Sequence, residues 1–416
     1  MSVPEGWTKS TLGDRSKLVT SGSRGWAKFY ADEGSPFYRI TNLRRSSITP
    51  DVTELKRVKL PPKVQKKHRT KLQAGDLLIS ITAELGVIGF IKSAPVQDSY
   101  INQHVALVRP ETTDTDPSFL AYLLASEPYR RRFWRMNDSG AKAGLNLPSV
   151  RSIGLTLPPL PEQRRIAEIL GTWDRAIAVQ EALIRTAERQ KTALMQQLLT
   201  PTRRLPGFTD EWEVVRLGDL GKISSAGVDK KVVDGETPVR LLNFTDVFSR
   251  EVIFDADLDH EVSAPDSKVR KCNVLAGDVF FTPTSETPDD IGISAVAGED
   301  MPGVTYSYHV VRLRPNRRLD PAYARYAFTI DGFRRQAVRV AQGSGQRYVI
   351  SQDMLRDMTI LVPTVEEQRA IGAAMNSVSD YIDQLKADLT HLRAEKTALM
   401  QQLLTGKRRV RVEEAA

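Results

Sequence analysis

The sequence contains a single cysteine, few histidines and no long apolar run. With Cys272 alone, the 416-residue chain cannot form an internal disulfide, which fits a reducing compartment such as the cytoplasm. One cysteine and five scattered histidines also leave no plausible zinc cluster. No apolar segment approaches the roughly 18 residues that a membrane span needs, and the N-terminal segment lacks the apolar core of a signal peptide. We therefore expect a cytoplasmic protein without a bound metal.

The motifs of common catalytic sites are also missing. There is no GxxxxGK[ST] phosphate loop, and Gly343-Ser-Gly345 lacks the third glycine of a dinucleotide fingerprint. The Pro-Pro-aromatic motif of amino-methyltransferases does not occur. Pro50-Asp51 and Glu54-Leu-Lys56 resemble a nuclease PD…ExK motif, but the two residues between them leave no room for the strands that carry it. The sequence therefore predicts a binding protein without catalytic residues.

An internal repeat determines the architecture. The segment KTALMQQLLT occurs at 191–200 and again, without a mismatch, at 396–405, an offset of 205 residues. The same offset aligns four further sets: Trp7 with Trp212, Leu12-Gly13-Asp14 with Leu217-Gly218-Asp219, His104 with His309, and Glu162-Gln163-Arg164 with Glu367-Gln368-Arg369. Between these anchors the offset drifts, as insertions and deletions in a variable region would cause. The chain is two copies of one unit, each with a divergent head and a nearly constant tail.

Each tail has the sequence pattern of a long helix. Apolar residues recur about every 3.5 residues over four heptads, as in a coiled-coil seam. The seam residues that we expect to pack are Leu170, Trp173, Ile177, Ile184, Leu194 and Leu198, and in the second copy Met375, Ile382, Leu389, Leu399 and Leu403. Prolines mark the start of both helices and Pro201 ends the first, which predicts helices of about 38 residues. Lys191 and Lys396 interrupt both seams at one position. They either fix the register or the oligomeric state, or extend their charge to solvent from the seam edge.

The two heads are predicted to be α+β. In the first head, residues 76–82, 86–91 and 104–108 form short β-rich runs between glycine-bearing turns, which indicates strands. A helix is expected at 118–134, and its counterpart at 321–339. The expected boundaries are heads at 1–158 and 209–363, spacer helices at 159–200 and 364–405, a linker at 201–208 and a charged tail at 406–416.

The heads differ in charge. Residues 1–160 contain 24 Lys and Arg against 14 Asp and Glu, whereas residues 207–365 contain 19 against 24. Eight cations within residues 56–71 favour an exposed loop that binds phosphates, the alternative being a solvated loop without a ligand. The second head has smaller arginine clusters at 312–318 and 334–347, and its acidic stretch at 255–261 must face away from a polyanion.

These features resemble the specificity subunit of type I restriction-modification systems. The resemblance covers essentially the whole chain and rests on the tandem head-plus-helix units, on Trp7 with Leu12-Gly13-Asp14, on residues 157–164 opening a helix and on KTALMQQLL closing it. It implies that each head is a target-recognition domain that reads one part of a split DNA site. It also implies that the paired helices form a spacer that docks two methyltransferase subunits. S-adenosylmethionine, ATP and Mg are then expected on partner subunits, including a restriction subunit where the system has one, and none on this chain.

DNA symmetry favours an antiparallel pairing of the two helices. The duplex has local twofold axes, so two equivalent modules approach opposite strands equivalently only when a twofold relates them. Antiparallel helices in one chain satisfy this condition as a pseudo-twofold repeat. Methylation of an adenine within a duplex needs extrusion of the base into a partner's pocket, so the task of this chain would be placement.

Three elements of the heads are the candidates for DNA contact. They are the loop that follows an expected first helix (21–25, matched by 225–227), the basic loop at 63–71, and the turn before the tail (140–146, matched by 345–348). The residues that we expect to contact bases or phosphates are Ser23, Arg24, Lys63, Lys66, Lys67, Arg69, Lys142, Asn146, Gln346, Arg347 and Tyr348. The glycines of these elements could equally serve only as turns with positive φ. His104 and His309 either contact a ligand or are structural.

Two other functions are compatible with the sequence. The chain could be the specificity subunit of a different multi-subunit restriction system, or a coiled-coil adaptor that binds proteins through both heads. Two divergent heads on nearly constant tails are typical of DNA-recognition proteins whose target sequences vary.

Overall fold

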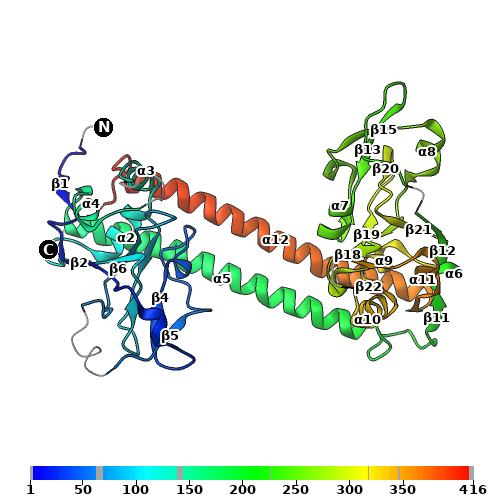
Figure 1. Ribbon diagram of the computed structural model, residues 1–416, viewed down its shortest axis with the longest axis horizontal. Coiled ribbons are helices and arrows are strands. Elements are labelled where there is room, and N and C mark those ends of the chain that lie inside the picture. The colour runs from blue at the N-terminus through cyan, green and yellow to red at the C-terminus, as the bar shows by residue number, and fades with distance from the viewer. Residues whose placement is uncertain are drawn as a thin grey trace. The chain divides into compact units, whose positions relative to one another are not determined.

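A computed structural model describes residues 3–61, 69–137, 144–225, 227–316, 318–344 and 347–411 (Figure 1). The chain forms two compact units, one of Met1–Glu181 with Ala387–Ala416 and the other of Ala182–Lys386. Each unit holds one head, the first part of one long helix and the last part of the other. The predicted α+β class, with two heads and two long helices, is confirmed.

The first head contains two four-stranded sheets and a two-stranded ribbon. The first sheet has the order β2 (Ser16–Ser21), β9 (Val105–Pro110), β6 (Leu77–Ser80) and β7 (Ile88–Phe90), all antiparallel. The second has the order β3 (Tyr30–Ala31), β5 (Lys56–Val58), β4 (Ser35–Tyr38) and β8 (Tyr100–Ile101). The ribbon pairs β1 (Thr8–Thr11) with β10 (Gly154–Leu157). Strands β6, β7 and β9 are the three strands that the sequence predicted.

The second head repeats this plan with additional strands. Its main sheet has the order β12 (Gly221–Ser224), β21 (Val311–Pro315), β17 (Val279–Phe281), β19 (Ser294–Ala297) and β14 (Val252–Ile253). A second sheet has the order β15 (Glu261–Ala264), β13 (Thr237–Leu242), β20 (Met301–Tyr306) and β16 (Asn273–Val274). A third has the order β18 (Thr284–Ser285), β23 (Arg347–Val349) and β22 (Gln342–Ser344), and β11 (Glu213–Arg216) pairs with β24 (Thr359–Val362).

The helical stretch expected at 118–134 is helical, but it is divided into two helices. Helix α2 (Pro117–Ala125) ends at Ser126, whose backbone is extended, and α3 (Glu127–Arg135) begins after it. Pro128 has no N–H to donate to the preceding turn, so α2 cannot continue through it. The second head is divided in the same way, into α9 (Pro321–Ala327) and α10 (Asp331–Val340).

The remaining helices of the heads are short. They are α4 (Leu147–Arg151), α6 (Leu217–Leu220), α7 (Phe244–Ser249), α8 (Asp266–Lys271) and α11 (Gln352–Asp357). The basic segment at 56–71 is not entirely a loop, because its first residues form β5; residues 62–68 lie outside the described residues.

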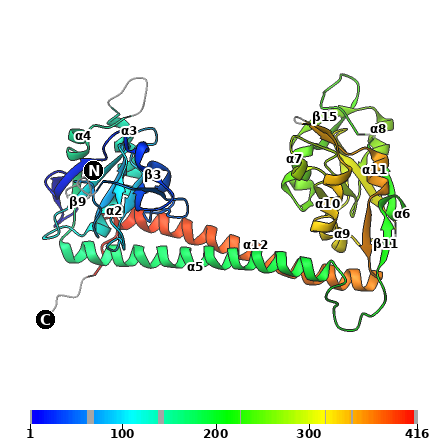
Figure 2. The same ribbon diagram turned by 60° about the horizontal axis from the view of Figure 1, so that its bottom comes forward.

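The two long helices have the same length. Helix α5 (Leu160–Leu198) and helix α12 (Val365–Leu403) contain 39 residues each. In the first unit, Lys396 pairs with Asp174, and one turn earlier on α12 Arg393 pairs with Glu181 at 2.7 Å. As residue numbers fall along α12 they rise along α5, so the helices are antiparallel, as predicted; Figure 2 shows the end of α12, in red, beside α5, in green.

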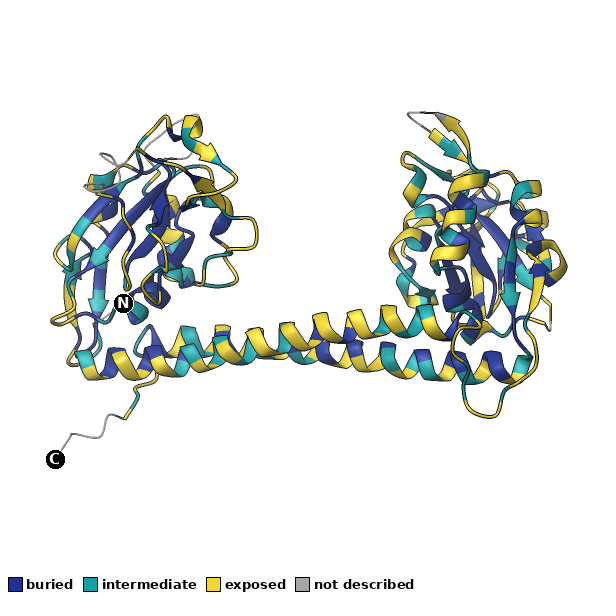
Figure 3. Cartoon of the chain, turned by 90° about the horizontal axis from the view of Figure 1, so that it is seen from below, coloured by how far each residue is buried: buried dark blue, intermediate teal, exposed yellow. Residues whose placement is uncertain are grey.

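Buried and exposed residues alternate along both long helices (Figure 3). The predicted seam residues that are buried are Leu170, Ile184, Leu198, Met375, Ile382, Leu389 and Leu403. Those that are half-buried are Trp173, Ile177, Leu194 and Leu399. The seam thus faces other parts of its unit along the whole length of both helices.

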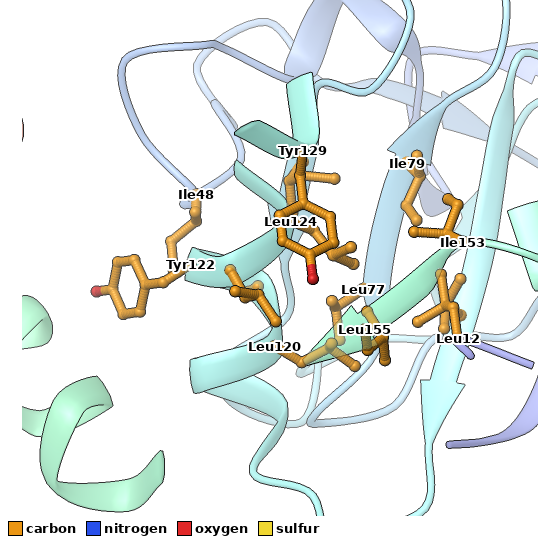
Figure 4. Packing of buried hydrophobic residues seen from close by; sticks show 14 of the residues in the cluster. Leu12, Ile48, Leu77, Ile79, Leu120, Tyr122, Leu124, Tyr129, Ile153 and Leu155 are labelled. Carbon is orange, nitrogen blue, oxygen red and sulfur yellow. The ribbon is translucent and has the colours of Figure 1, made fainter. Parts of the chain in front are cut away.

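The ends of the tails enter the cores of the heads. Leu403 and Leu404, from the second repeat, belong to the core of the first head, whose leucine and isoleucine side chains Figure 4 shows. Leu198 and Leu199, from the first repeat, belong to the core of the second head. Each leucine buried in this way contributes roughly 1.5–3 kcal/mol. The tails are therefore exchanged between repeats: each one completes the core of the other repeat's head.

A glutamine at the start of each long helix fixes that helix to its own head. The Gln163 side chain accepts a hydrogen bond from the Asp116 N–H at 2.9 Å and donates to the carbonyl oxygens of Asp114 and Pro158, at 3.1 and 2.9 Å. Gln368 makes the same three bonds in the second unit, to the backbone of Asp320, Arg318 and Pro363. Because both buried amides are fully used, the matched Glu-Gln-Arg motif has a structural role.

The glutamate of this motif binds an arginine that follows the opposite tail. Arg409 donates two hydrogen bonds to the Glu162 carboxylate, at 2.7 and 2.8 Å. Arg204 binds Glu367 in the same bidentate way, with both bonds at 2.6 Å. These two pairs hold the exchanged tails in place, and bidentate pairs of this kind impose a defined geometry.

Candidate nucleic-acid interface

The loop at 21–25 passes very close to the turn that precedes β9. A Cβ at Gly22 would lie 2.2 Å from the carbonyl carbon of Asn102, so only glycine fits there. Gly227 has the same relationship to Ser307, at 2.3 Å. Neither of these two glycines has a positive φ, whereas Gly25 does, at 80°. The close approach explains the matched glycines, and the interpretation of Gly22 and Gly227 as positive-φ turns was wrong.

A tryptophan anchors this loop on its other side. Trp26 begins a short 3-10 helix (Trp26–Phe29) and stacks on Phe37 with ring centroids 5.2 Å apart. It also meets the edge of Tyr100 at 5.4 Å. The loop follows strand β2 and not a helix, contrary to the prediction. Arg24 is exposed between the two fixed points, and Ser23 is half-buried.

The described part of the turn before the tail, residues 144–146, lies near His104 in the first head. Gly144 forms a β-bridge with Thr82, and the Thr82 hydroxyl is 2.9 Å from His104 Nδ1. Asn146 accepts a hydrogen bond from the Ser149 N–H at 2.7 Å, which caps helix α4. The structure therefore brings together the first and third of the predicted elements, with the turn at His104 between them.

The second head has the equivalent arrangement. Val228 donates to the Tyr306 carbonyl at 2.9 Å, and Tyr308 donates back to the Val228 carbonyl at 3.2 Å. Strand β23, which begins with the exposed Arg347, pairs with β18, so that Ser285 lies opposite the half-buried Tyr348. The loop after β12 is therefore joined to the turn before β21, and the described end of the turn before the tail, from Arg347, is part of the sheet β18-β23-β22.

Side chains from the loop after β12 and from strand β23 both affect the ionisation of His309. Partial burial and the positive charges of Lys230 and Arg347 lower the pKa of His309, and Asp229 opposes them. The imidazole is therefore neutral at pH 7. Sequence analysis missed Lys230 and Tyr308 as candidate contacts, although the alignment of His104 with His309 marks this turn.

The other predicted contact residues are not all part of this surface. Arg69 is exposed on the segment that leads to Leu72, whose N–H bonds the Ser99 carbonyl at 2.9 Å. Lys63, Lys66, Lys67, Lys142 and Gln346 lie outside the described residues.

Two arginines of the second head are structural. Arg314 donates to both oxygens of the buried Asp278, at 2.7 and 2.6 Å, and Arg312 is buried against the Asn273 carbonyl at 2.6 Å. Arg109 and Asp76 form the same pair in the first head, at 2.7 and 2.8 Å. These cations hold strands together and are not available to phosphates.

The described residues contain no group of three or more His, Cys, Asp or Glu side chains that could hold a metal ion. Within the same residues, no helix has the length and apolar character to cross a membrane.

Comparisons with known proteins agree with this architecture. Residues 4–189 match the family described as the type I restriction modification DNA specificity domain. The EcoKI type I restriction enzyme specificity subunit of Escherichia coli K12 is 23% identical, over 97% of this chain and 88% of the relative.

Two solved structures share the fold over nearly the whole chain. One, from work on complex assembly and conformational transition of the type I R-M system, covers 98% of this chain and all of its own, with a TM-score of 0.62 and 17% identity. The type I restriction-modification S subunit of M. genitalium covers 95% of this chain and 96% of its own, with a TM-score of 0.56 and 12% identity. Residues 4–189 therefore match the type I restriction modification DNA specificity domain, and the chain as a whole is similar in sequence and fold to specificity subunits of type I restriction-modification systems.

Proposed function

We propose that this chain reads a split, asymmetric DNA sequence, one part with each head, for a type I restriction-modification enzyme. One observation carries the proposal: equivalent loops gather at one end of each head but present different side chains. The loop at 21–25 of the first head presents Arg24. In the second head Arg347 lies on the turn before the tail, where the first head has Lys142, and Tyr308 takes the position of Gln103. Two similar frames with different reading residues would recognise two different half-sites.

The chain itself performs no chemistry in this proposal. It places partner methyltransferase subunits, which bind S-adenosylmethionine, on the target adenines. A restriction subunit, where the system has one, uses ATP and Mg. The spacer helices present exposed apolar side chains that would suit protein partners, among them Leu183 on α5 (44% exposed) and Tyr381 on α12 (55% exposed).

Selection from random DNA tests the function. The chain assembled with its methyltransferase would be used to enrich bound duplexes, which would then be sequenced. We expect two short fixed segments separated by a constant number of unselected positions. A protein-binding adaptor would enrich no sequence, and a single continuous motif would contradict reading by two heads.

A further inference from the structure

His104 and His309 occupy the same position in the two repeats but have different surroundings. Each is half-buried and lies just before a strand: His104 directly precedes β9, and His309 is separated from β21 by one residue. Each turn is also contacted closely by a matched glycine, Gly22 or Gly227. The difference between the two sites therefore comes from the side chains around each ring.

In the first head, both ring nitrogens of His104 are occupied. Nδ1 lies 2.9 Å from the Thr82 hydroxyl, and Nε2 lies 3.0 Å from the Gln103 amide nitrogen. Thr82 also forms the bridge to Gly144, so the imidazole links three segments of this head. An imidazole whose two nitrogens are both satisfied within the protein has no hydrogen bond left for a base.

In the second head, Tyr308 takes the place of Gln103. Its ring centroid lies 4.0 Å from that of His309, and its side chain is 49% exposed. Among the described residues, no side chain or backbone group makes a hydrogen bond to either ring nitrogen of His309. Within the described part of this head, the imidazole thus keeps one donor and one acceptor, and the tyrosine ring limits its orientation.

The charges around His309 suit a position between two phosphates. Lys230 is exposed two residues after Val228, which hydrogen-bonds the turn of His309, and the exposed Arg347 begins β23. Burial and these two positive charges lower the pKa of His309, so the ring is neutral beside two cations. Cations contact the phosphate backbone without reading sequence, whereas a neutral donor–acceptor pair matches the pattern on a base edge in the major groove. The second head therefore combines a positioning group and a reading group within one turn.

We propose that His309, oriented by Tyr308, reads a base in the half-site of the second head, whereas His104 only holds the first head together. The proposal rests on the function proposed above and assigns different roles to two residues that the repeat makes equivalent. The partner of the imidazole would be a purine N7 or an exocyclic amino group.

The test compares the methylomes that two matched variants direct. Wild type, His309→Ala and His104→Ala would each be co-expressed with the methyltransferase in a host without adenine methylation, and modified sites mapped by long-read sequencing. For His309→Ala we expect methylation of sites with a substituted base at one position of one half-site to rise about tenfold, with the other half-site unchanged. For His104→Ala we expect the same two half-sites as wild type, with fewer modified copies.

Two further variants keep the result interpretable. Tyr308→Phe retains the stacked ring and should leave the motif unchanged, and Arg347→Ala should lower methylation at all sites without changing the motif. An unchanged motif for His309→Ala, or a uniform loss at all sites with a wild-type melting temperature, would overturn the proposal. If the wild-type chain directs no split motif at all, it is the proposed function that fails.

Discussion

Lys396, near the end of α12, is 7% exposed and pairs with Asp174 on α5. Its ammonium also lies 5.5 Å from the centre of the Tyr122 ring, and the Tyr122 hydroxyl donates to Asp174 at 2.5 Å. The matching Lys191 pairs with Glu251 at 2.6 Å and lies 5.4 Å from the Tyr326 ring. Of the two interpretations of these lysines, the structure supports register: they join tail to head and do not extend to solvent.

Loss of the carboxylate that pairs with Lys396 should destabilise the first unit. Asp174→Ala leaves the ammonium of Lys396 buried without its carboxylate, which should cost about 3 kcal/mol of the free energy of unfolding. Lys386→Ala is the control, because it removes an exposed ion pair with Glu188 and should cost less than about 1 kcal/mol. Urea unfolding measures both; equal losses would refute the role of the buried pair.

The exchange of tails predicts that a change in one repeat destabilises the head of the other. Leu403→Ala should cost about 2–5 kcal/mol, because Leu403 lies in the core of the first head. Amide hydrogen exchange would locate the effect: we expect faster exchange than in wild type in the first head and an unchanged exchange rate in the second. Leu198→Ala should give the reverse pattern, and a loss confined to the head of the same repeat would contradict the exchange.

Glu251 makes the stability of the second unit depend on pH. Burial raises its pKa, but the hydrogen bond and charge of Lys191 and the charge of Arg325 outweigh burial, so that its pKa is below the ordinary value of 4.5. A carboxylate whose pKa is lower in the folded than in the unfolded state stabilises the fold at pH values above its unfolded pKa. This contribution is lost as the pH falls through the folded pKa.

Glu251→Gln should therefore destabilise the second unit at pH 7. The difference from wild type should shrink as the pH falls below about 4.5, as urea midpoints measured across this range would record. A difference that stays constant with pH would show that the carboxylate charge contributes nothing.

The two heads should respond separately to loss of an exposed arginine. Arg24→Ala should weaken binding to the half-site of the first head by about 1–3 kcal/mol, as expected for loss of a base contact. Arg347→Ala should weaken binding to specific and random duplexes alike, because its guanidinium is expected to contact a phosphate. Binding of the assembled complex to specific and random duplexes measures this. Equal losses on both kinds of DNA from Arg24→Ala would identify a phosphate contact there too, and a change of base preference at both half-sites from one variant would contradict separate reading.

The sequence predicted the long helices because their heptads and proline boundaries are local signals. It predicted strands β6, β7 and β9 from β-branched and aliphatic runs between turns. It could not show which head each tail completes, because the two tails share an identical ten-residue segment and both heads accept it. Pro128 was a signal for the break between α2 and α3 that the prediction overlooked.

The candidate site was less predictable, because its contacts join residues far apart in sequence. The partner of His104 is Thr82, 22 residues away, and Gly22 faces Asn102. Charge alone could not show that Arg312 and Arg314 are structural, because their partner Asp278 is more than 30 residues away in sequence.

The central claim is that the two heads together specify one split DNA site. The most direct measurement is the methylome of the host with and without this gene, by modification-sensitive long-read sequencing. We predict that deletion removes one asymmetric methyladenine motif consisting of two half-sites and a constant gap. A methylome that loses only a continuous motif, or that loses nothing from a host in which the wild-type gene is expressed with its methyltransferase, would contradict the account.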